Sequence, residues 1–171
     1  MFKVLKSVEC SVATASADPW IPLTVSWQLR LRGRPLYLCV TGDDGGYVEL
    51  KVDPDSGALY ALVLVDLPPL TDRPVEHAPV ERESLSPVFD LDLWEWKITP
   101  DYKEPAKFDV DATSSLAYST VGDLSALWFS CSPVGRYLEC GEVRVGVSDI
   151  DELVSIVVRR PPVIKPDLSM A

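Results

Sequence analysis

Apolar and polar residues alternate along much of this chain, so that every second residue is apolar. The clearest run extends from Ile21 to Leu31, where the residues between the apolar ones are polar, charged or proline. Alternation of this kind is typical of a β-strand with one buried and one exposed face. The same pattern at 2–12, interrupted only by Lys6 on its apolar side, predicts a second strand of this type.

Turn-forming residues divide the chain that follows into short strands. We expect strands at 36–41, 47–52 and 58–66, and the loop 53–57 places a proline and a glycine where a tight turn requires them. Consecutive short strands separated by turns predict an antiparallel meander. The strand at 58–66 is apolar on both faces, so it should lie centrally in its sheet.

A proline-rich segment at 67–87 interrupts this pattern. Its five prolines cannot continue a strand ladder or a long helix, so they predict a linker or surface loop. A helix is plausible only at 113–127, where the content of threonine, serine, valine and glycine is unfavourable for one. Strands are expected again at 88–98, 107–111, 126–131, 137–147 and 153–159.

Together these patterns predict a mainly β protein with little helix, whose antiparallel sheets form a sandwich or a partly open barrel. We expect a single domain at 1–160 and a tail at 161–171. Duplication of two halves, 1–66 and 88–160, and chance similarity between alternating strands both explain a weak internal repeat. With Gly46 laid on Gly141 and one residue deleted after Val52, Val48, Leu50, Val52, Leu59, Leu62 and Leu64 match Val143, Val145, Val147, Leu153, Ile156 and Val158.

The charge of the chain limits its classes of partner. The formal net charge is -10 and the pI is about 4.5, so the electrostatic field of the protein repels nucleic acid and anionic membranes. The segment 1–17 lacks the apolar run of an export signal, and no other run is long enough to span a bilayer. We therefore expect a cytoplasmic protein that binds neither nucleic acid nor membrane.

The four cysteines show neither the spacing of a zinc site nor the density of a disulfide-stabilised scaffold. Buried free thiols are the simplest interpretation. A two-residue hairpin loop at Gly135-Arg136 would bring Cys131 opposite Cys140, close enough for a disulfide. In a reducing cytoplasm this pair would remain open.

Side chains suited to catalysis are scarce. His77 is the only histidine, which excludes a histidine-rich metal site. We expect it to be an exposed side chain in a charged loop, and no motif around it favours a histidine-based triad. Aspartates recur two residues apart on expected strands, namely Asp90 with Asp92, Asp109 with Asp111, and Asp149 with Asp151. Such pairs could serve hydrolysis or hold a divalent cation, but the exposed face of a half-buried strand looks the same. The turn 53–57 lacks the glutamate that completes a calcium loop, and we expect no metal and no cofactor.

Tryptophans are more informative, with five in 171 residues. On the strand expected at 88–98, Trp94 and Trp96 share one face and Glu95 points to the other. A tryptophan pair can stack on a sugar or an apolar ligand, anchor a protein interface, or pack in a core. The sequence leaves all three interpretations open.

Taken together, the sequence favours a non-enzymatic, acidic protein-binding domain, in its most concrete form an immunity-type or inhibitor protein that masks a basic partner. The stretch from Asp66 to Glu104 holds ten acidic and four basic residues and is the expected contact region. The candidate binding residues are Glu81, Glu83, Asp90, Asp92, Trp94, Glu95 and Trp96. Two alternatives remain: a carboxylate-dependent hydrolase, and a carrier of a small apolar or sugar-like ligand lined by Trp27, Trp94 and Trp96. The oligomeric state stays open.

Overall fold

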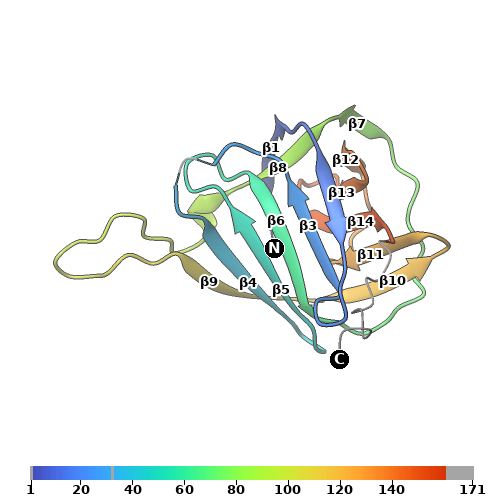
Figure 1. Cartoon of the computed structure of the whole chain (residues 1–171), viewed down its shortest axis with the longest axis horizontal. Coiled ribbons are helices and arrows are strands. Elements are labelled where there is room, and N and C mark those ends of the chain that lie inside the picture. Colours follow the sequence, from blue (N-terminus) through green and yellow to red (C-terminus); the bar gives the residue numbers. More distant parts are fainter. Residues whose placement is uncertain (1, 32, 161–171) are drawn as a thin grey trace, which may run out of the picture.

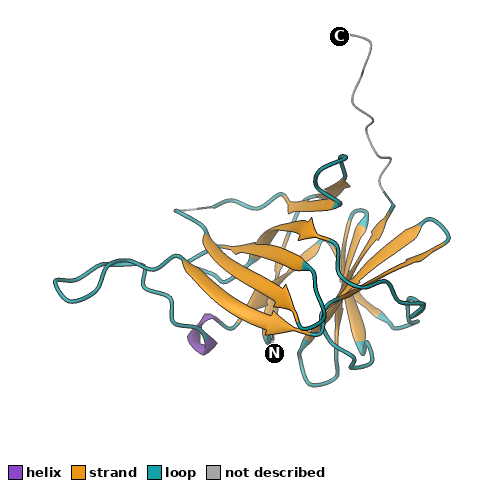
Figure 2. Cartoon of the chain, turned by 90° about the horizontal axis from the view of Figure 1, so that it is seen from below, coloured by secondary structure: helices purple, strands orange, loops and turns teal. Residues whose placement is uncertain are grey.

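The computed structural model describes residues 2–31 and 33–160, so the tail expected at 161–171 lies outside the described residues. Within them the regular secondary structure is almost entirely β-strand (Figure 1), and the one helical element is a short 3-10 turn, η1 (Leu91–Leu93), drawn in purple in Figure 2. The strands are β1 (Val4–Glu9), β2 (Ala13–Ser16), β3 (Leu23–Trp27), β4 (Leu36–Gly42), β5 (Tyr47–Val52), β6 (Leu59–Asp66), β7 (Val80–Glu83), β8 (Leu85–Phe89), β9 (Asp109–Ser114), β10 (Ala117–Val121), β11 (Leu124–Trp128), β12 (Arg136–Cys140), β13 (Val143–Val147) and β14 (Leu153–Arg159). No helix in this part of the chain is long and apolar enough to cross a membrane.

Two six-stranded sheets pack around one core, and the two-stranded sheet β1–β8 joins them, because β8 contacts both β6 and β12. The first sheet has the order β2-β3-β6-β5-β4-β9 and the second has the order β10-β11-β14-β13-β12-β7. Neighbouring strands are antiparallel except for β4–β9 and β12–β7, which are parallel. The prediction of a mainly β, sandwich-like fold with little helix is therefore confirmed, although each large sheet is mixed at one edge.

Burial follows the alternating pattern in the strands that build the core. In β4, Leu36, Leu38 and Val40 are fully buried, whereas Tyr37 and Cys39 on the other face are only half-buried. Side chains from the second sheet belong to the same buried cluster as those of β4. The apolar faces of the two sheets thus form one shared interior.

The two large sheets repeat the same topology. Strands β10 to β14 occupy the same relative places as β2 to β6. The residues matched in the sequence have matching partners: Val48 pairs with Leu64, Leu50 with Leu62 and Val52 with Leu59, while Val143 pairs with Val158, Val145 with Ile156 and Val147 with Leu153. Both hairpins also carry a register shift at the same point, before Val52 and before Val147. The match found in the sequence therefore corresponds to a structural repeat of five strands.

The two halves are interlocked through their outer strands. One edge of the first sheet is β9, although in the sequence β9 lies directly before the five strands of the second repeat. One edge of the second sheet is β7, although in the sequence β7 follows the five strands of the first repeat. The pair β1–β8 binds to both repeats in the same way: the N–H of Phe89 donates to the carbonyl of Gly57 (2.9 Å), and the N–H of Val4 donates to that of Asp151 (2.8 Å). Gly57 and Asp151 hold equivalent places in the two repeats, and both have positive φ.

The proline-rich segment packs closely on the second sheet, and we call residues 67–79 the strap. The Arg73 guanidinium lies 3.8 Å from the ring centre of Trp128 and donates to the carbonyls of Ser130 and Ser132, each at 2.7 Å. It also forms an ion pair with Glu76. The strap is a surface connection, as expected, but these contacts fix it to the sheet. The expectation of a loop is wrong for the rest of the segment 67–87, because it contains β7 and most of the buried strand β8.

The strand expected at 88–98 is the main error of the sequence analysis. β8 ends at Phe89, because the Asp90 side chain accepts a hydrogen bond from the N–H of Asp92 (3.1 Å) and caps η1. The chain then forms an irregular loop that is closed by a single bridge between Lys97 and Lys107. We call residues 94–107 the tryptophan loop. Trp94 and Trp96 therefore do not lie on a strand, and local capping overrides the alternating pattern.

Other expectations fail locally. The run 21–31 is a strand only in β3, and the segment 113–127 contains β10 and β11 instead of a helix. The strand expected at 137–147 is instead a hairpin of β12 and β13, which turns at Gly141, whose φ of 57° suits a tight turn. No hairpin forms at Gly135-Arg136, because residues 129–135 are not a strand. Cys131 is exposed, Cys140 is buried, and both are free thiols.

Candidate functional site

A groove of three adjoining hollows lies where the β5–β6 turn meets β1, β8 and the tryptophan loop. The tryptophan hollow, of about 700 Å³, is lined by that turn and by the loop. It shares Asp55 and Ser56 with the middle hollow, of about 350 Å³. The middle hollow shares Glu9, Leu29 and Arg30 with the end hollow, of about 470 Å³. The shared residues show that the three hollows adjoin one another.

Backbone contacts fix the walls of this groove relative to one another. The N–H of Phe89 donates to the carbonyl of Gly57, and the N–H of Asp90 donates to that of Lys3 (3.0 Å). Gly57 has a φ of 78°, and a Cβ atom there would lie 2.5 Å from the carbonyl oxygen of Phe89. Only glycine permits this approach, so the residue holds the turn against β8.

Trp94 and Trp96 connect the tryptophan hollow to the core. Their rings lie 6.3 Å apart at 76°, and Trp94 lies 6.2 Å from the ring of Phe2, which in turn contacts Phe129 edge-on at 5.8 Å. Both tryptophans are half-buried and pack against the core while lining the hollow. Because the two rings are nearly perpendicular, they form an apolar corner and not a flat stacking platform.

Three carboxylates surround this corner. Asp55 and Asp92 are exposed and Asp90 is half-buried. None of them forms an ion pair with any other described residue. The lysine of the loop itself, Lys97, is engaged elsewhere, because hydrogen bonds from its ammonium to Asp101 and then to Glu104 raise its pKa. Among the described residues, therefore, no ion pair compensates the negative charge of the rim.

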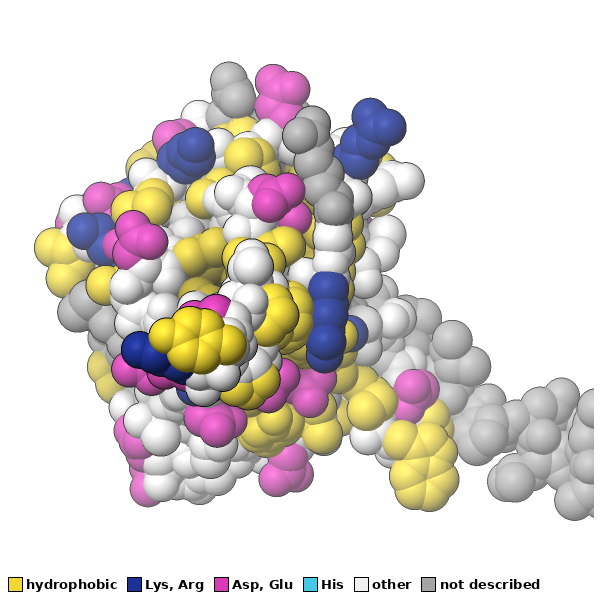
Figure 3. All heavy atoms as spheres, turned by 90° about the vertical axis from the view of Figure 1, so that its left-hand side faces the viewer, with side chains coloured by type: hydrophobic (Ala, Val, Ile, Leu, Met, Phe, Trp, Pro, Cys, Tyr) yellow, Lys and Arg dark blue, Asp and Glu magenta, His cyan; other side chains and the backbone are white. Residues whose placement is uncertain are grey.

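The net charge of the groove as a whole is negative. Its described lining contains five carboxylates and one guanidinium, a formal charge of -4. The carboxylates belong to Glu9, Asp53, Asp55, Asp90 and Asp92, and the guanidinium belongs to Arg30. Figure 3 looks at the end of the molecule from which the tryptophan loop projects, and acidic side chains there are interspersed with exposed hydrophobic ones.

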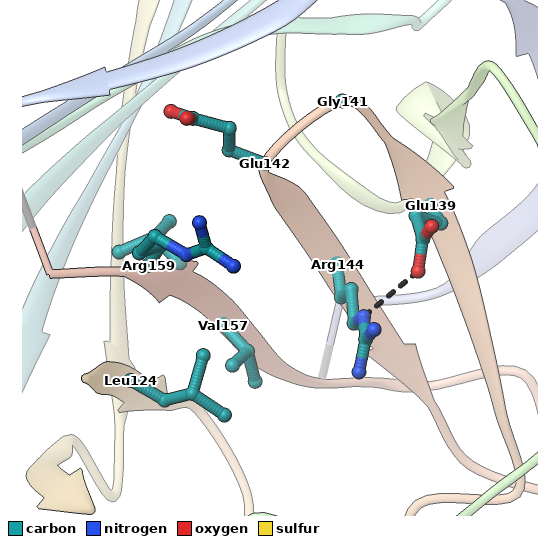
Figure 4. A pocket seen from close by; sticks show the side chains of 8 residues that line it. Leu124, Glu139, Gly141, Glu142, Arg144, Val157 and Arg159 are labelled. Atoms are coloured by element: carbon teal, nitrogen blue, oxygen red, sulfur yellow. Dashed lines mark hydrogen bonds and ion pairs between the residues drawn. The ribbon is translucent and has the colours of Figure 1, made fainter. Parts of the chain in front are cut away.

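A hollow of about 260 Å³ on the second sheet offers a contrast (Figure 4). Its charged lining consists of two glutamates and two arginines from β12, the following turn, β13 and β14. Arg144 donates to Glu139 at 2.8 Å, and Figure 4 shows Glu142 and Arg159 on the other side of the hollow. This hollow is formally neutral, so it lacks the negative field of the groove.

The structure brings four of the predicted binding residues together: Asp90, Asp92, Trp94 and Trp96 all line the tryptophan hollow. Glu95 is exposed in the same loop and does not belong to the lining. Glu81 lies elsewhere, on β7, where it pairs with Arg136 (3.2 Å). The side chain of Glu83 lies outside the described residues.

Sequence reasoning missed Asp53 and Asp55, which it assigned only to a turn. Nothing local distinguishes these residues from ordinary turn aspartates. They join the groove because the β5–β6 turn is bonded to β8, a contact between segments more than 30 residues apart. A signal for them exists only in the three-dimensional arrangement of the two repeats.

The remaining candidate chemistry stays dispersed. His77 is exposed, as predicted, and Asp109 and Asp111 lie on the exposed face of β9. Asp151 pairs with Arg136 at 2.9 Å in the turn before β14. Among the described residues, no group of three histidine, cysteine, aspartate or glutamate side chains is arranged to hold a metal ion.

Comparison with known proteins adds no identity. No protein-family model matches the sequence, and no curated protein is significantly similar to it.

Proposed function

We propose that this chain is a non-enzymatic protein-binding domain of the immunity or inhibitor type, which acts in the cytoplasm by covering a basic, partly apolar segment of a partner protein. The observation that supports it best is the tryptophan hollow, where Asp55, Asp90 and Asp92 lie around two half-buried tryptophans without an ion pair to any described residue. An apolar floor with an unneutralised acidic rim suits a segment in which arginine or lysine alternates with large apolar residues.

The magnitudes favour a contact that needs both kinds of residue. A cation about 5 Å from one rim carboxylate gains roughly 0.8 kcal/mol in water, and screening by salt reduces that gain. A leucine or aromatic side chain that fills the apolar corner contributes about 1.5–3 kcal/mol. The negative charge thus increases the association rate and favours basic partners, while burial of an apolar side chain on Trp94 and Trp96 supplies most of the affinity.

The geometry is less favourable for the alternatives. A carrier site lined by three tryptophans would need Trp27 beside Trp94 and Trp96, but Trp27 is buried in the core and is not part of the hollow's lining. The perpendicular rings also give a sugar no flat platform. The volume of the tryptophan hollow still suits a small ligand, so a bound small molecule is an outcome that the experiment must be able to detect.

Fluorescence anisotropy with a labelled six-residue peptide of alternating arginine and leucine tests the proposal. We expect saturable binding at low salt, at least fivefold weaker binding in 300 mM NaCl, and much weaker binding of the analogue with citrulline in place of arginine. Removing two rim charges with Asp90→Asn and Asp92→Asn should weaken binding about tenfold. Asparagine at position 90 can still cap η1, so the loop is retained.

The matched control removes the same charge from the second sheet, with Asp123→Asn and Glu142→Gln. We expect this pair to change the affinity less than twofold. An equal loss from both pairs would show that the groove has no role beyond net charge. Equal binding of the citrulline peptide, or a small apolar molecule retained in native mass spectrometry, would favour the carrier instead.

A further inference from the structure

β9 forms one edge of the first sheet, where β4 is its only neighbouring strand in the described chain (Figure 1). An N–H at the start of β4 donates to the carbonyl of Phe108 (2.7 Å), and one just after the end of β4 donates to that of Ser114 (2.9 Å). In a parallel strand both backbone groups of a residue point to the same side, and successive residues alternate, so the even-numbered residues of β9 bind β4. The N–H and C=O groups of Asp109, Asp111 and Thr113 therefore point away from β4 and have no hydrogen-bond partner among the described residues.

The other three edges of the two large sheets are shorter or covered. The strap covers β10, because the N–H of Thr71 donates to the carbonyl of Tyr118 (2.9 Å) and the N–H of Tyr118 donates to that of Pro69 (3.0 Å). β2 and β7 have four residues each, and the pairing of β7 is irregular. β9 has six residues, all paired with β4 in one unbroken register. A long, regular edge with free backbone groups is a template for a further strand.

The side chains of β9 define the chemistry of a segment that fits there. Asp109 and Asp111 are exposed on the outer face of the sheet, and neither forms an ion pair with any other described residue. On the inner face, Val110 is buried and Ala112 packs against the core. A strand beside β9 would place alternate side chains on these two faces. Basic residues beside the aspartates and apolar residues beside Val110 and Ala112 complement this edge.

The same charges disfavour a second copy of this chain at β9. Two β9 strands that paired antiparallel about their centre would bring Asp111 directly opposite its own copy, and each copy carries a formal net charge of -10. Like charges opposite each other destabilise a strand pair. Aspartates on an edge strand therefore hinder self-association but favour a basic strand.

We propose that β9 is a strand-addition site, where an extended segment of a partner protein, with lysine or arginine alternating with apolar residues, pairs as a seventh strand of the first sheet. This surface is separate from the groove and does not depend on it. Hydrogen bonds to the backbone of Asp109, Asp111 and Thr113 supply affinity that is independent of sequence. The two aspartates select a basic segment and increase its association rate.

Amide hydrogen exchange followed by NMR tests this inference, with a seven-residue peptide of alternating lysine and valine as probe. In the free protein we expect fast exchange at Asp109, Asp111 and Thr113, and slow exchange at the residues between them, whose N–H groups bind β4. Saturating peptide should slow exchange at the three edge amides at least tenfold, and 300 mM NaCl should weaken binding at least fivefold. Unchanged exchange with the peptide bound would overturn the inference. Slow exchange in the free protein would also overturn it, because the edge would then already be occupied by another segment or a second copy.

Two substitutions of Thr113 provide a matched pair. Thr113→Pro removes one outward N–H and no hydrogen bond to β4, at a kind of position where edge strands tolerate proline, whereas Thr113→Val keeps the N–H. We expect at least fivefold weaker binding for Thr113→Pro and a change of less than twofold for Thr113→Val, with the urea midpoint showing that both variants are folded. Equal affinities of two folded variants would contradict strand addition. If Asp90→Asn with Asp92→Asn weakens the peptide and Thr113→Pro does not, the peptide binds in the groove and the inference fails.

Modified peptides test the same point on the unmodified protein. In an added strand, the backbone N–H groups of every second residue face β9 and the others face solvent. Methylation of all lysine backbone nitrogens and methylation of all valine backbone nitrogens should therefore differ, with one analogue losing binding and the other staying within threefold of the parent peptide. Equal effects of the two analogues would overturn the inference, because they would show that the contact does not use the backbone edge.

Discussion

The contact between the strap and the second sheet gives a quantitative prediction for Arg73→Ala. The guanidinium makes two charged hydrogen bonds to carbonyls, stacks on Trp128 and pairs with Glu76, with 21% of the arginine side chain exposed. Two such hydrogen bonds in a partly exposed place contribute about 2 kcal/mol, the stacking about 1 kcal/mol, and the ion pair less than about 1 kcal/mol. Because these contacts share one side chain, we expect a total loss of about 3 kcal/mol.

Urea unfolding followed by tryptophan fluorescence measures this loss. For a protein of this size, with a slope of about 2 kcal/mol per molar urea, the midpoint should fall by about 1.5 M. Arg73→Lys keeps the charge but not the planar fork, so its urea midpoint should lie between those of the unmodified protein and Arg73→Ala. The control is Arg159→Ala, whose ion pair with Asp123 is 3.5 Å long with both side chains more than 70% exposed. Arg159→Ala should cost less than about 0.5 kcal/mol. If Arg73→Ala shifts the urea midpoint no more than Arg159→Ala does, the reasoning is refuted.

Three further predictions concern acid stability, a glycine and the thiols. Burial raises the pKa of the Glu76 carboxyl, but hydrogen bonds from Arg73 and from a backbone N–H outweigh burial and lower this pKa below its usual value. The ionised Glu76 therefore stabilises the fold above about pH 4.5, and this stabilisation is lost as the pH falls through the lowered pKa of the folded state. Glu76→Gln should therefore flatten the acid limb of the stability profile, and an unchanged limb would contradict this. Gly57→Ala should destabilise by about 2–4 kcal/mol, because positive φ and a close carbonyl oxygen both oppose a Cβ atom. Gly122→Ala, at a position with positive φ but with open space around it, should cost only about 1–2 kcal/mol. Equal losses of stability in the two variants would contradict a steric clash at Gly57. Burial, with the neighbouring Cys10 adding to it, raises the pKa of the Cys140 thiol to about 12, so iodoacetamide at pH 8 should label Cys131 quickly and Cys140 only after unfolding.

Alternation predicted the core strands well, because one face of each is buried and the side-chain period forces the other outward. β5 shows this clearly, and the aligned residues of the two repeats have equivalent pairing. Alternation fails where a polar side chain competes for the backbone. At Asp90 the carboxylate captures the N–H of Asp92, ends β8 and releases the tryptophans into a loop.

Long-range arrangement was beyond what the sequence pattern could supply. The parallel edge strands β7 and β9 each join the sheet of the other half, and no local signal encodes such an exchange. The tryptophans and Asp90 were recognised as candidates from their residue types, and the structure brings them together in one hollow. Asp53 and Asp55 could not be recognised in this way, because the contact that brings their turn to β8 exists only in the folded state.

The two repeats also differ in a way that supports a role for the groove. Arg136 in the second repeat neutralises Asp151 and Glu81 beside the equivalent turn, with contacts of 2.9 and 3.2 Å. The equivalent position in the first repeat is Leu36, since Leu36 pairs with Val52 as Arg136 pairs with Val147. Leucine there lines the tryptophan hollow and leaves the nearby aspartates without a basic partner in the described chain. Because the same framework accommodates neutralised acids in the second repeat, the open charge of the first repeat is not a requirement of the fold, which supports the proposal that a basic partner binds there.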